Sequence, residues 1–179
     1  MNSALILIDI QNDYFKNGKN ELYQPEQAAL QAKRTLDYFR NKGLPVYHVQ
    51  HINIREGATF FIPDTFGAET HASVKPQRGE KVFVKHVPNS FFDTGLADEL
   101  TKKQIDHIIV CGMMSHMCID TTVRAAQDFG LTTTVLHDAC ATKDLVWKKA
   151  TIPAPVVHDT IMASLHGIFA NVISTEEFL

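Results

Sequence analysis

The chain has 179 residues, of which 45% are hydrophobic and 21% charged, and its net charge is −3 at pH 7. This length and composition predict one globular domain covering residues 1–179. The negative charge and the scattered lysines and arginines argue against nucleic acid or an anionic membrane as a partner, and no apolar run approaches the ~20 residues of a membrane span.

The start of the chain and its cysteines favour the cytosol. The apolar run near the N-terminus has no basic segment before it and ends at Asp9, unlike the run in a signal peptide. Three cysteines are too few, and odd in number, for a disulfide framework, and they suit a reducing compartment. We therefore expect a cytoplasmic protein.

Short apolar runs alternate with helical patterns along the chain. The apolar runs predict strands at 4–8, 45–50, 81–84, 108–111, 132–136 and 169–173. Helical spacing predicts helices at 25–41, 96–103, 119–129 and 158–168, with helical turns at 144–149 and after Ser174. Alternating strands and helices indicate βαβ units, and therefore a parallel sheet with helices on both faces. No glycine-rich phosphate loop follows the first strand, so a nucleotide-binding role lacks its main sequence signal.

Cys118 lies at the junction between the fourth predicted strand and the helix that follows it. The N-terminus of a helix offers free N–H groups and a partial positive charge, which favour a thiolate and can hold an oxyanion. The alternative is that Cys118 is a small buried core residue, as free cysteines often are.

Two further residues with reactive side chains also follow predicted strands directly. Asp9 directly follows the first strand and Lys85 follows the third. Because the carboxyl ends of parallel strands meet at one edge of the sheet, we expect the three side chains to lie together. A carboxylate can take the thiol proton while an ammonium stabilises both anions, so this set predicts a nucleophilic site.

Several motifs, in this order and spacing, resemble the isochorismatase-like cysteine hydrolase family over nearly the whole chain. They are LIDIQNDYF at 7–15, VK at 84–85, SFF at 90–92, TGL at 94–96, CGMMSHMC at 111–118, Thr122, Arg124, AA at 125–126, Gly130, HDA at 137–139 and FANV at 169–172. The resemblance implies an α/β, three-layer Rossmann-like fold whose six-stranded parallel sheet has the order 3-2-1-4-5-6. It also implies a catalytic triad of Asp9, Lys85 and Cys118, a cis peptide between Met113 and Met114, and an oxyanion hole formed by the backbone N–H groups of Met114 and Cys118.

The presence of Cys118 indicates which reaction to expect. Family members that hydrolyse isochorismate itself lack the cysteine, so Cys118 points to a hydrolase that cleaves an amide-type C–N bond of a small molecule through a thioester. In that reaction Asp9 is the general base and later the acid, and Lys85 lowers the thiol pKa and orients Asp9. The alternatives are a non-catalytic binding module with the same fold, or a redox protein that uses Cys118 with Cys140.

No metal or other cofactor is expected. The nicotinamidase branch of the family carries an Asp-x-His metal motif after the second strand, but here no aspartate precedes His48 and His51 at the required spacing. Residues three apart on a strand also face opposite sides, so these two histidines are not expected to chelate one ion.

The long segment 53–79 is too apolar for a plain solvent loop and is expected to act as a lid or partner contact. Its residues 60–62 would leave an apolar patch on a monomer, which together with the resemblance predicts a homo-oligomer. Six residues are tentative substrate contacts, with core packing or a structural hydrogen bond as the alternative: Gln11, Phe15, His51, Phe61, Phe92 and His116.

Overall fold

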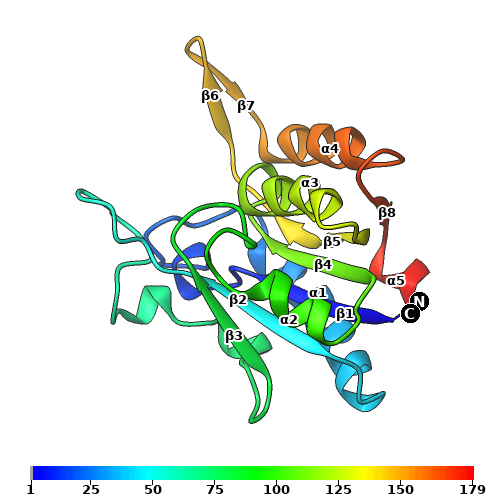
Figure 1. Ribbon diagram of the computed structural model, residues 1–179. Coiled ribbons are helices and arrows are strands. Elements are labelled where there is room, and N and C mark those ends of the chain that lie inside the picture. The colour runs from blue at the N-terminus through cyan, green and yellow to red at the C-terminus, as the bar shows by residue number, and fades with distance from the viewer. Residues whose placement is uncertain (1) are drawn as a thin grey trace.

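A computed structural model describes residues 2–179 and has a six-stranded sheet at its centre (Figure 1). All neighbouring strands are parallel, and their order is β3-β2-β1-β4-β5-β8. The strands are β1 (Ser3–Ile8), β2 (Val46–His51), β3 (Lys81–Lys85), β4 (His107–Met113), β5 (Thr132–Ala141) and β8 (Asn171–Ile173). This arrangement confirms the predicted fold and strand order. The sixth strand of the sheet is β8 because a separate hairpin precedes it in the chain.

Helices cover both faces of the sheet and bury one apolar cluster on each side. Apolar residues of α1 (Pro25–Asn41), with Phe178 of α5 (Thr175–Phe178), pack against one face. The other face is covered by α2 (Leu96–Lys102), α3 (Asp120–Asp128) and α4 (Ala154–Leu165). Strands buried from both sides have continuous apolar sequences, which is the pattern that β1 and β4 show. Among residues 2–179, no helix has both the length and the apolar character that crossing a membrane requires.

The segment between β5 and α4 differs from the prediction. Where a helical turn was expected at 144–149, strands β6 (Leu145–Trp147) and β7 (Ala150–Ile152) form an antiparallel hairpin that projects from the body of the molecule (Figure 1). Lys148 and Lys149 join these strands with φ angles of 49° and 66°. Two successive residues with positive φ are typical of a two-residue hairpin loop, but lysine carries none of the usual sequence signal for one.

Two other element boundaries differ by more than three residues. The fifth strand continues to Ala141 rather than ending at residue 136, and the fourth helix begins at Ala154 rather than at residue 158. Pro153 is the N-cap of that helix and Pro155 lies in its first turn, where a missing N–H costs nothing. The two prolines therefore lie at the start of the helix.

Gly112 allows β1 and β4 to approach each other at the edge that carries the site. It pairs with Ile8, has a φ of 134°, and a Cβ atom there would lie 2.0 Å from the Ile8 carbonyl oxygen. We expect Gly112→Ala to lower the free energy of unfolding by about 3 kcal/mol or more, since the clash is with backbone that cannot move alone.

The matched control is Gly43→Ala. Gly43 also has a positive φ, of 63°, but an added Cβ would meet nothing within 4 Å. This variant is expected to lose about 1 kcal/mol, the cost of the left-handed conformation alone. Urea unfolding measures both changes, and equal losses would show that the close approach at Gly112 is unimportant.

Candidate active site

The ends of β1, β3 and β4 bring together the three residues that the sequence singled out. Asp9 follows β1, Lys85 is the last residue of β3, and Cys118 lies just beyond β4. Lys85 starts two strands away from Asp9, yet its Nζ lies 2.7 Å from Asp9 Oδ2. The same Nζ donates a hydrogen bond to Cys118 Sγ at 3.1 Å, so the lysine bridges the carboxylate and the thiol.

The Asp9–Lys85 ion pair is completely buried, with both side chains 0% exposed. Burial lowers the pKa of Lys85, but the neighbouring Asp9 and Cys118 more than offset it, so the pKa is raised and the ammonium persists. Neither carboxylate oxygen of Asp9 has another hydrogen-bond partner within residues 2–179. The carboxylate is therefore free to accept a proton from a neighbour. Asp9 also has a φ of 52°, a conformation rare outside glycine and found often at functional sites.

Cys118 lies in a single π-helical turn, Ser115–Ile119, that precedes α3. The sequence predicted a position at or near the start of an α-helix, and the π turn is a local variation that often occurs at functional sites. Burial, and then the charge of Asp9, raise the pKa of the Cys118 thiol, and Lys85 offsets only part of this. Lys85 lowers the thiol pKa as predicted, but its effect is smaller than the opposing effects of burial and Asp9, so the thiol form is favoured over the thiolate.

His51 completes the surroundings of the lysine. Its Nδ1 lies 3.2 Å from Lys85 Nζ, and because an ammonium can only donate, Nδ1 must be the acceptor and Nε2 must carry the ring proton. Burial, together with the charge of Lys85, lowers the pKa of His51 to about 4. The ring is therefore neutral at pH 7 and faces the lysine. His48 lies apart from this centre and pairs with Glu80, as expected for residues three apart on a strand.

The loop between β4 and the π turn has the expected backbone. The peptide between Met113 and Met114 is cis, which confirms the prediction. Met114 caps the π turn, and its carbonyl oxygen accepts hydrogen bonds from the N–H groups of Met117 and Ile119. Met114 and Cys118 therefore belong to one tight turn, Met114 as its N-cap and Cys118 within it.

Gln11 and Asp13 fix the long loop that follows β2. Gln11 is fully buried; its side chain donates to the carbonyl oxygens of His51 and Ala68 and accepts from the His51 N–H. Asp13 is also buried and accepts from the Phe61 N–H at 2.7 Å. These contacts favour a positioning role for Gln11 rather than the predicted substrate contact. They also hold in place a loop that was expected to act as a lid or a partner contact.

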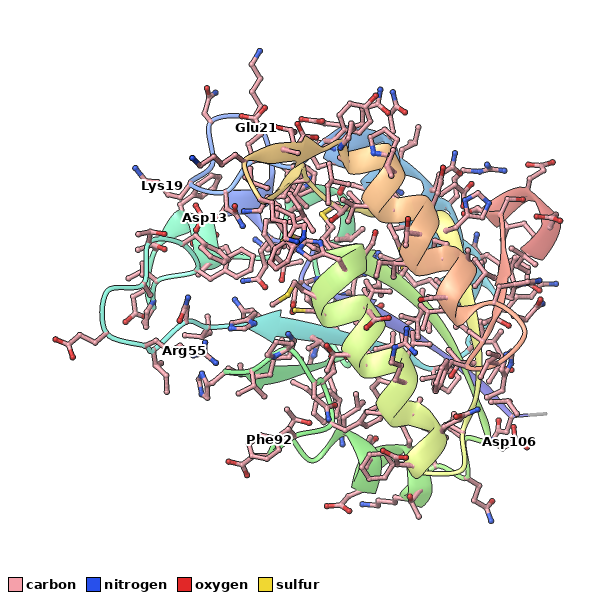
Figure 2. The ribbon with its side chains drawn as sticks, turned by 90° about the horizontal axis from the view of Figure 1, so that it is seen from above. Asp13, Lys19, Glu21, Arg55, Phe92 and Asp106 are labelled. Carbon is pink, nitrogen blue, oxygen red and sulfur yellow. The ribbon has the colours of Figure 1, made fainter. Side chains whose placement is uncertain are left out.

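Among the other candidate substrate contacts, three have the core packing or hydrogen bond that was the alternative interpretation, and the fourth is exposed. Phe61 is 0% exposed and packs edge-on against Tyr14, whereas Phe92 is 63% exposed at the outer edge of the molecule (Figure 2). Phe15 is buried and stacks on another ring, that of His71. His116 is committed to Thr142 through a 2.5 Å hydrogen bond. Core packing or local structure explains Phe15, Phe61 and His116, and Phe92 lies away from the buried centre.

A polar clamp that sequence reasoning missed joins the lysine segment to the cysteine segment. The buried Ser90 and Thr122 side chains share a 2.8 Å hydrogen bond, and the Ser90 N–H donates to Thr122 Oγ1. Lys85 Nζ also donates to the carbonyl oxygen of Val87, in the same segment as Ser90. Both Ser90 and Thr122 belong to the motifs of the resemblance, but a buried hydroxyl pair has no periodic signal of its own.

Comparisons with known proteins show the family to which this chain belongs. The family model described as Isochorismatase domain matches residues 3–177. The chain belongs to the isochorismatase family. It is 52% identical over 179 residues to the uncharacterised isochorismatase family protein YddQ of Bacillus subtilis, covering 100% of this chain and 99% of that one. The isochorismatase family comprises hydrolases.

Two further relatives extend the comparison. A crystal structure of an isochorismatase hydrolase from Oleispira antarctica superposes with a TM-score of 0.95 at 46% identity, covering 99% of this chain and 95% of that one. A streptothricin hydrolase of Streptomyces noursei is 32% identical over 162 residues, which cover 90% of this chain and 61% of the relative. The isochorismatase fold is therefore shared along the chain.

Proposed function

We propose that this isochorismatase-family protein is a cysteine hydrolase that cleaves the C–N bond of a small amide-type substrate. The observation that carries the proposal is the buried contact of one ammonium, Lys85, with both the Asp9 carboxylate and the Cys118 thiol. Such a set supplies a nucleophile, a proton acceptor and a fixed positive charge in one place. The relationship to a streptothricin hydrolase supports hydrolytic chemistry.

The first half of the reaction forms a thioester. Cys118 Sγ attacks the substrate carbonyl carbon while its proton passes to Asp9, and the N–H groups of Met114 and Cys118 receive the oxyanion. Asp9 then returns the proton to the leaving nitrogen, and the C–N bond breaks to release ammonia or an amine. Lys85 keeps the side chains of Asp9 and Cys118 in position throughout the reaction.

The second half restores the enzyme. Water attacks the thioester carbonyl, Asp9 takes one of the water protons, and the C–S bond breaks to give a carboxylic acid. The proton on Asp9 returns to the Cys118 sulfur. His51 is partly exposed whereas Asp9, Lys85 and Cys118 are buried, so we expect the substrate to approach from the His51 side.

The test is a panel of small amides and ureas, assayed for ammonia or amine release with and without EDTA. We expect turnover of at least one compound, unaffected by the chelator, and no turnover by Cys118→Ala. Loss of activity after EDTA that zinc or manganese restores would overturn the metal-independent mechanism. A panel without any turnover, together with a Cys118–Cys140 disulfide after peroxide treatment, would favour the redox alternative.

We also propose that the protein is cytoplasmic and acts as a homo-oligomer. The three cysteines are all buried and unpaired, as a reducing compartment allows. The apolar residues 60–62 do not support assembly as predicted, because Phe61 is buried and its two neighbours are partly covered. A better candidate contact is the projecting β6–β7 hairpin, where Val146 is 72% and Trp147 68% exposed.

A charge placed on that hairpin tests the assembly. We expect the wild-type protein to have an oligomeric mass by light scattering at micromolar concentration and Trp147→Glu to be monomeric, because an interface does not tolerate a buried unpaired carboxylate. Phe66→Glu is the matched control, since Phe66 is 76% exposed on a different loop. A monomeric wild-type protein, or an unchanged mass for Trp147→Glu, would contradict the proposed contact.

A further inference from the structure

The Lys85 ammonium has more acceptors around it than it has protons to donate. Its Nζ lies 2.7 Å from Asp9 Oδ2, 3.1 Å from Cys118 Sγ, and 3.2 Å from both His51 Nδ1 and the Val87 carbonyl oxygen. An ammonium carries three N–H donors, whereas four acceptors surround it here. This is a shell around a small cation rather than a simple salt bridge.

The side chains of that shell are ligands for a metal ion. Asp9, His51 and Cys118 each offer one ligand atom, and these atoms lie within 4.8 Å of one another. Carboxylate oxygen, imidazole nitrogen and thiolate sulfur are the three ligand types of zinc. The sulfur and nitrogen ligands favour zinc-like ions over magnesium or calcium, which prefer oxygen.

The Lys85 ammonium and a divalent ion would each be electrically neutralised by the side chains of the centre. In the buried centre the Lys85 ammonium is paired with the Asp9 carboxylate. A divalent ion would be neutralised by the same carboxylate and by the Cys118 thiolate, the thiol proton passing to solvent. The ammonium and the ion cannot occupy the centre together, because two positive charges at this separation repel strongly where water is excluded.

We propose that Asp9, His51 and Cys118 form a latent site for a zinc-like divalent cation, which the Lys85 ammonium fills and keeps closed. In this protein the lysine supplies the positive charge of the centre, and such an ion acts as a competitor rather than a cofactor. This metal site is a separate inference from the proposed hydrolysis. Its ligands do not form the Asp-x-His motif of the nicotinamidase branch.

Cobalt(II) is a spectroscopic probe for such a site, since a Co–thiolate bond gives a near-ultraviolet charge-transfer band. We expect Lys85→Met, which removes the charge but keeps an unbranched side chain, to bind one Co²⁺ per chain at least about 100-fold more tightly than the wild-type protein. Circular dichroism establishes that the variant is folded. Equal affinity in the two proteins would overturn the proposal.

Second substitutions in the Lys85→Met background identify the ligands. Cys118→Ser should remove the charge-transfer band and His51→Phe should weaken binding, whereas Cys140→Ser should change neither because that thiol lies outside the centre. A band that survives Cys118→Ser would contradict the assignment.

A second uncharged variant, Lys85→Gln, decides the matter if Lys85→Met does not fold. Zinc in excess should slow the alkylation of Cys118 by iodoacetamide, mapped by mass spectrometry, far more in Lys85→Gln than in the wild-type protein, and adding His51→Phe should reduce that protection. Equal effects of zinc on the wild-type protein and on Lys85→Gln would overturn the proposal. Neither experiment uses turnover, so each is independent of the proposed hydrolase activity.

Discussion

The Cys118→Ser variant is expected to lose at least about a thousandfold in kcat on any amide that the wild-type protein hydrolyses. A serine hydroxyl holds its proton far more firmly than a thiol, and the centre already raises the pKa of the group at this position through burial and the nearby Asp9 charge. Asp9 would therefore have to remove a much less acidic proton. The change is nearly isosteric, so the fold should be retained.

Cys140→Ser is the matched control for this prediction. Cys140 is also buried on the same side of the sheet, and burial raises its pKa to about 12, but it is not a neighbour of Lys85. Its replacement should leave kcat within a few-fold of the wild-type value. A Cys118→Ser variant that keeps most of its activity, or a Cys140→Ser variant that loses it, would contradict the choice of nucleophile.

Asp9→Asn is expected to have opposite effects on two rates. Turnover should fall by about three orders of magnitude, because no group remains to carry the proton from the thiol to the leaving nitrogen. Alkylation of Cys118 by iodoacetamide at pH 7 should become faster. Apart from burial, the Asp9 charge is the largest cause of the raised thiol pKa, so its removal increases the thiolate fraction.

Lys85→Ala serves as the comparison, because it removes the opposite charge from the same contact. The thiolate then loses its stabilising ammonium while the carboxylate remains, so alkylation should slow. The alkylation rates of Cys118 in the two variants are measured by quenching samples at set times and analysing them by mass spectrometry. If Asp9→Asn slowed alkylation as much as Lys85→Ala, Asp9 would not be the group that holds the thiol proton in place.

Much of the fold could be predicted from the sequence because its signals are local. The runs at β1 and β4 are continuously apolar, and α1 has the predicted bounds because it combines a clear apolar stripe with Pro25 at its start. The β6–β7 hairpin was missed because Lys148 and Lys149 form its turn without glycine or asparagine. The length of β5 was underestimated because its second half, from His137, mixes polar and small residues.

The residues of the site could be predicted from the sequence, but the direction of the thiol pKa shift could not. The ends of β1, β3 and β4 placed Asp9, Lys85 and Cys118 together by topology alone. The depth of burial, which decides the direction of the thiol pKa, depends on packing from both faces and leaves no mark in the motif. The roles of Gln11 and His51 likewise depend on contacts with segments distant in the sequence.

Capture of the thioester tests the central proposal most directly. The reaction of the wild-type protein with an amide substrate is quenched in acid during turnover. The mass of the peptide that contains Cys118 is then measured by mass spectrometry. We expect that peptide to gain the mass of the substrate acyl group, with no gain on the peptide that contains Cys140. Hindered substrates slow acyl transfer to water, so the adduct should accumulate with them. Continued product formation without an acyl adduct on Cys118 under these conditions would contradict nucleophilic catalysis by this thiol.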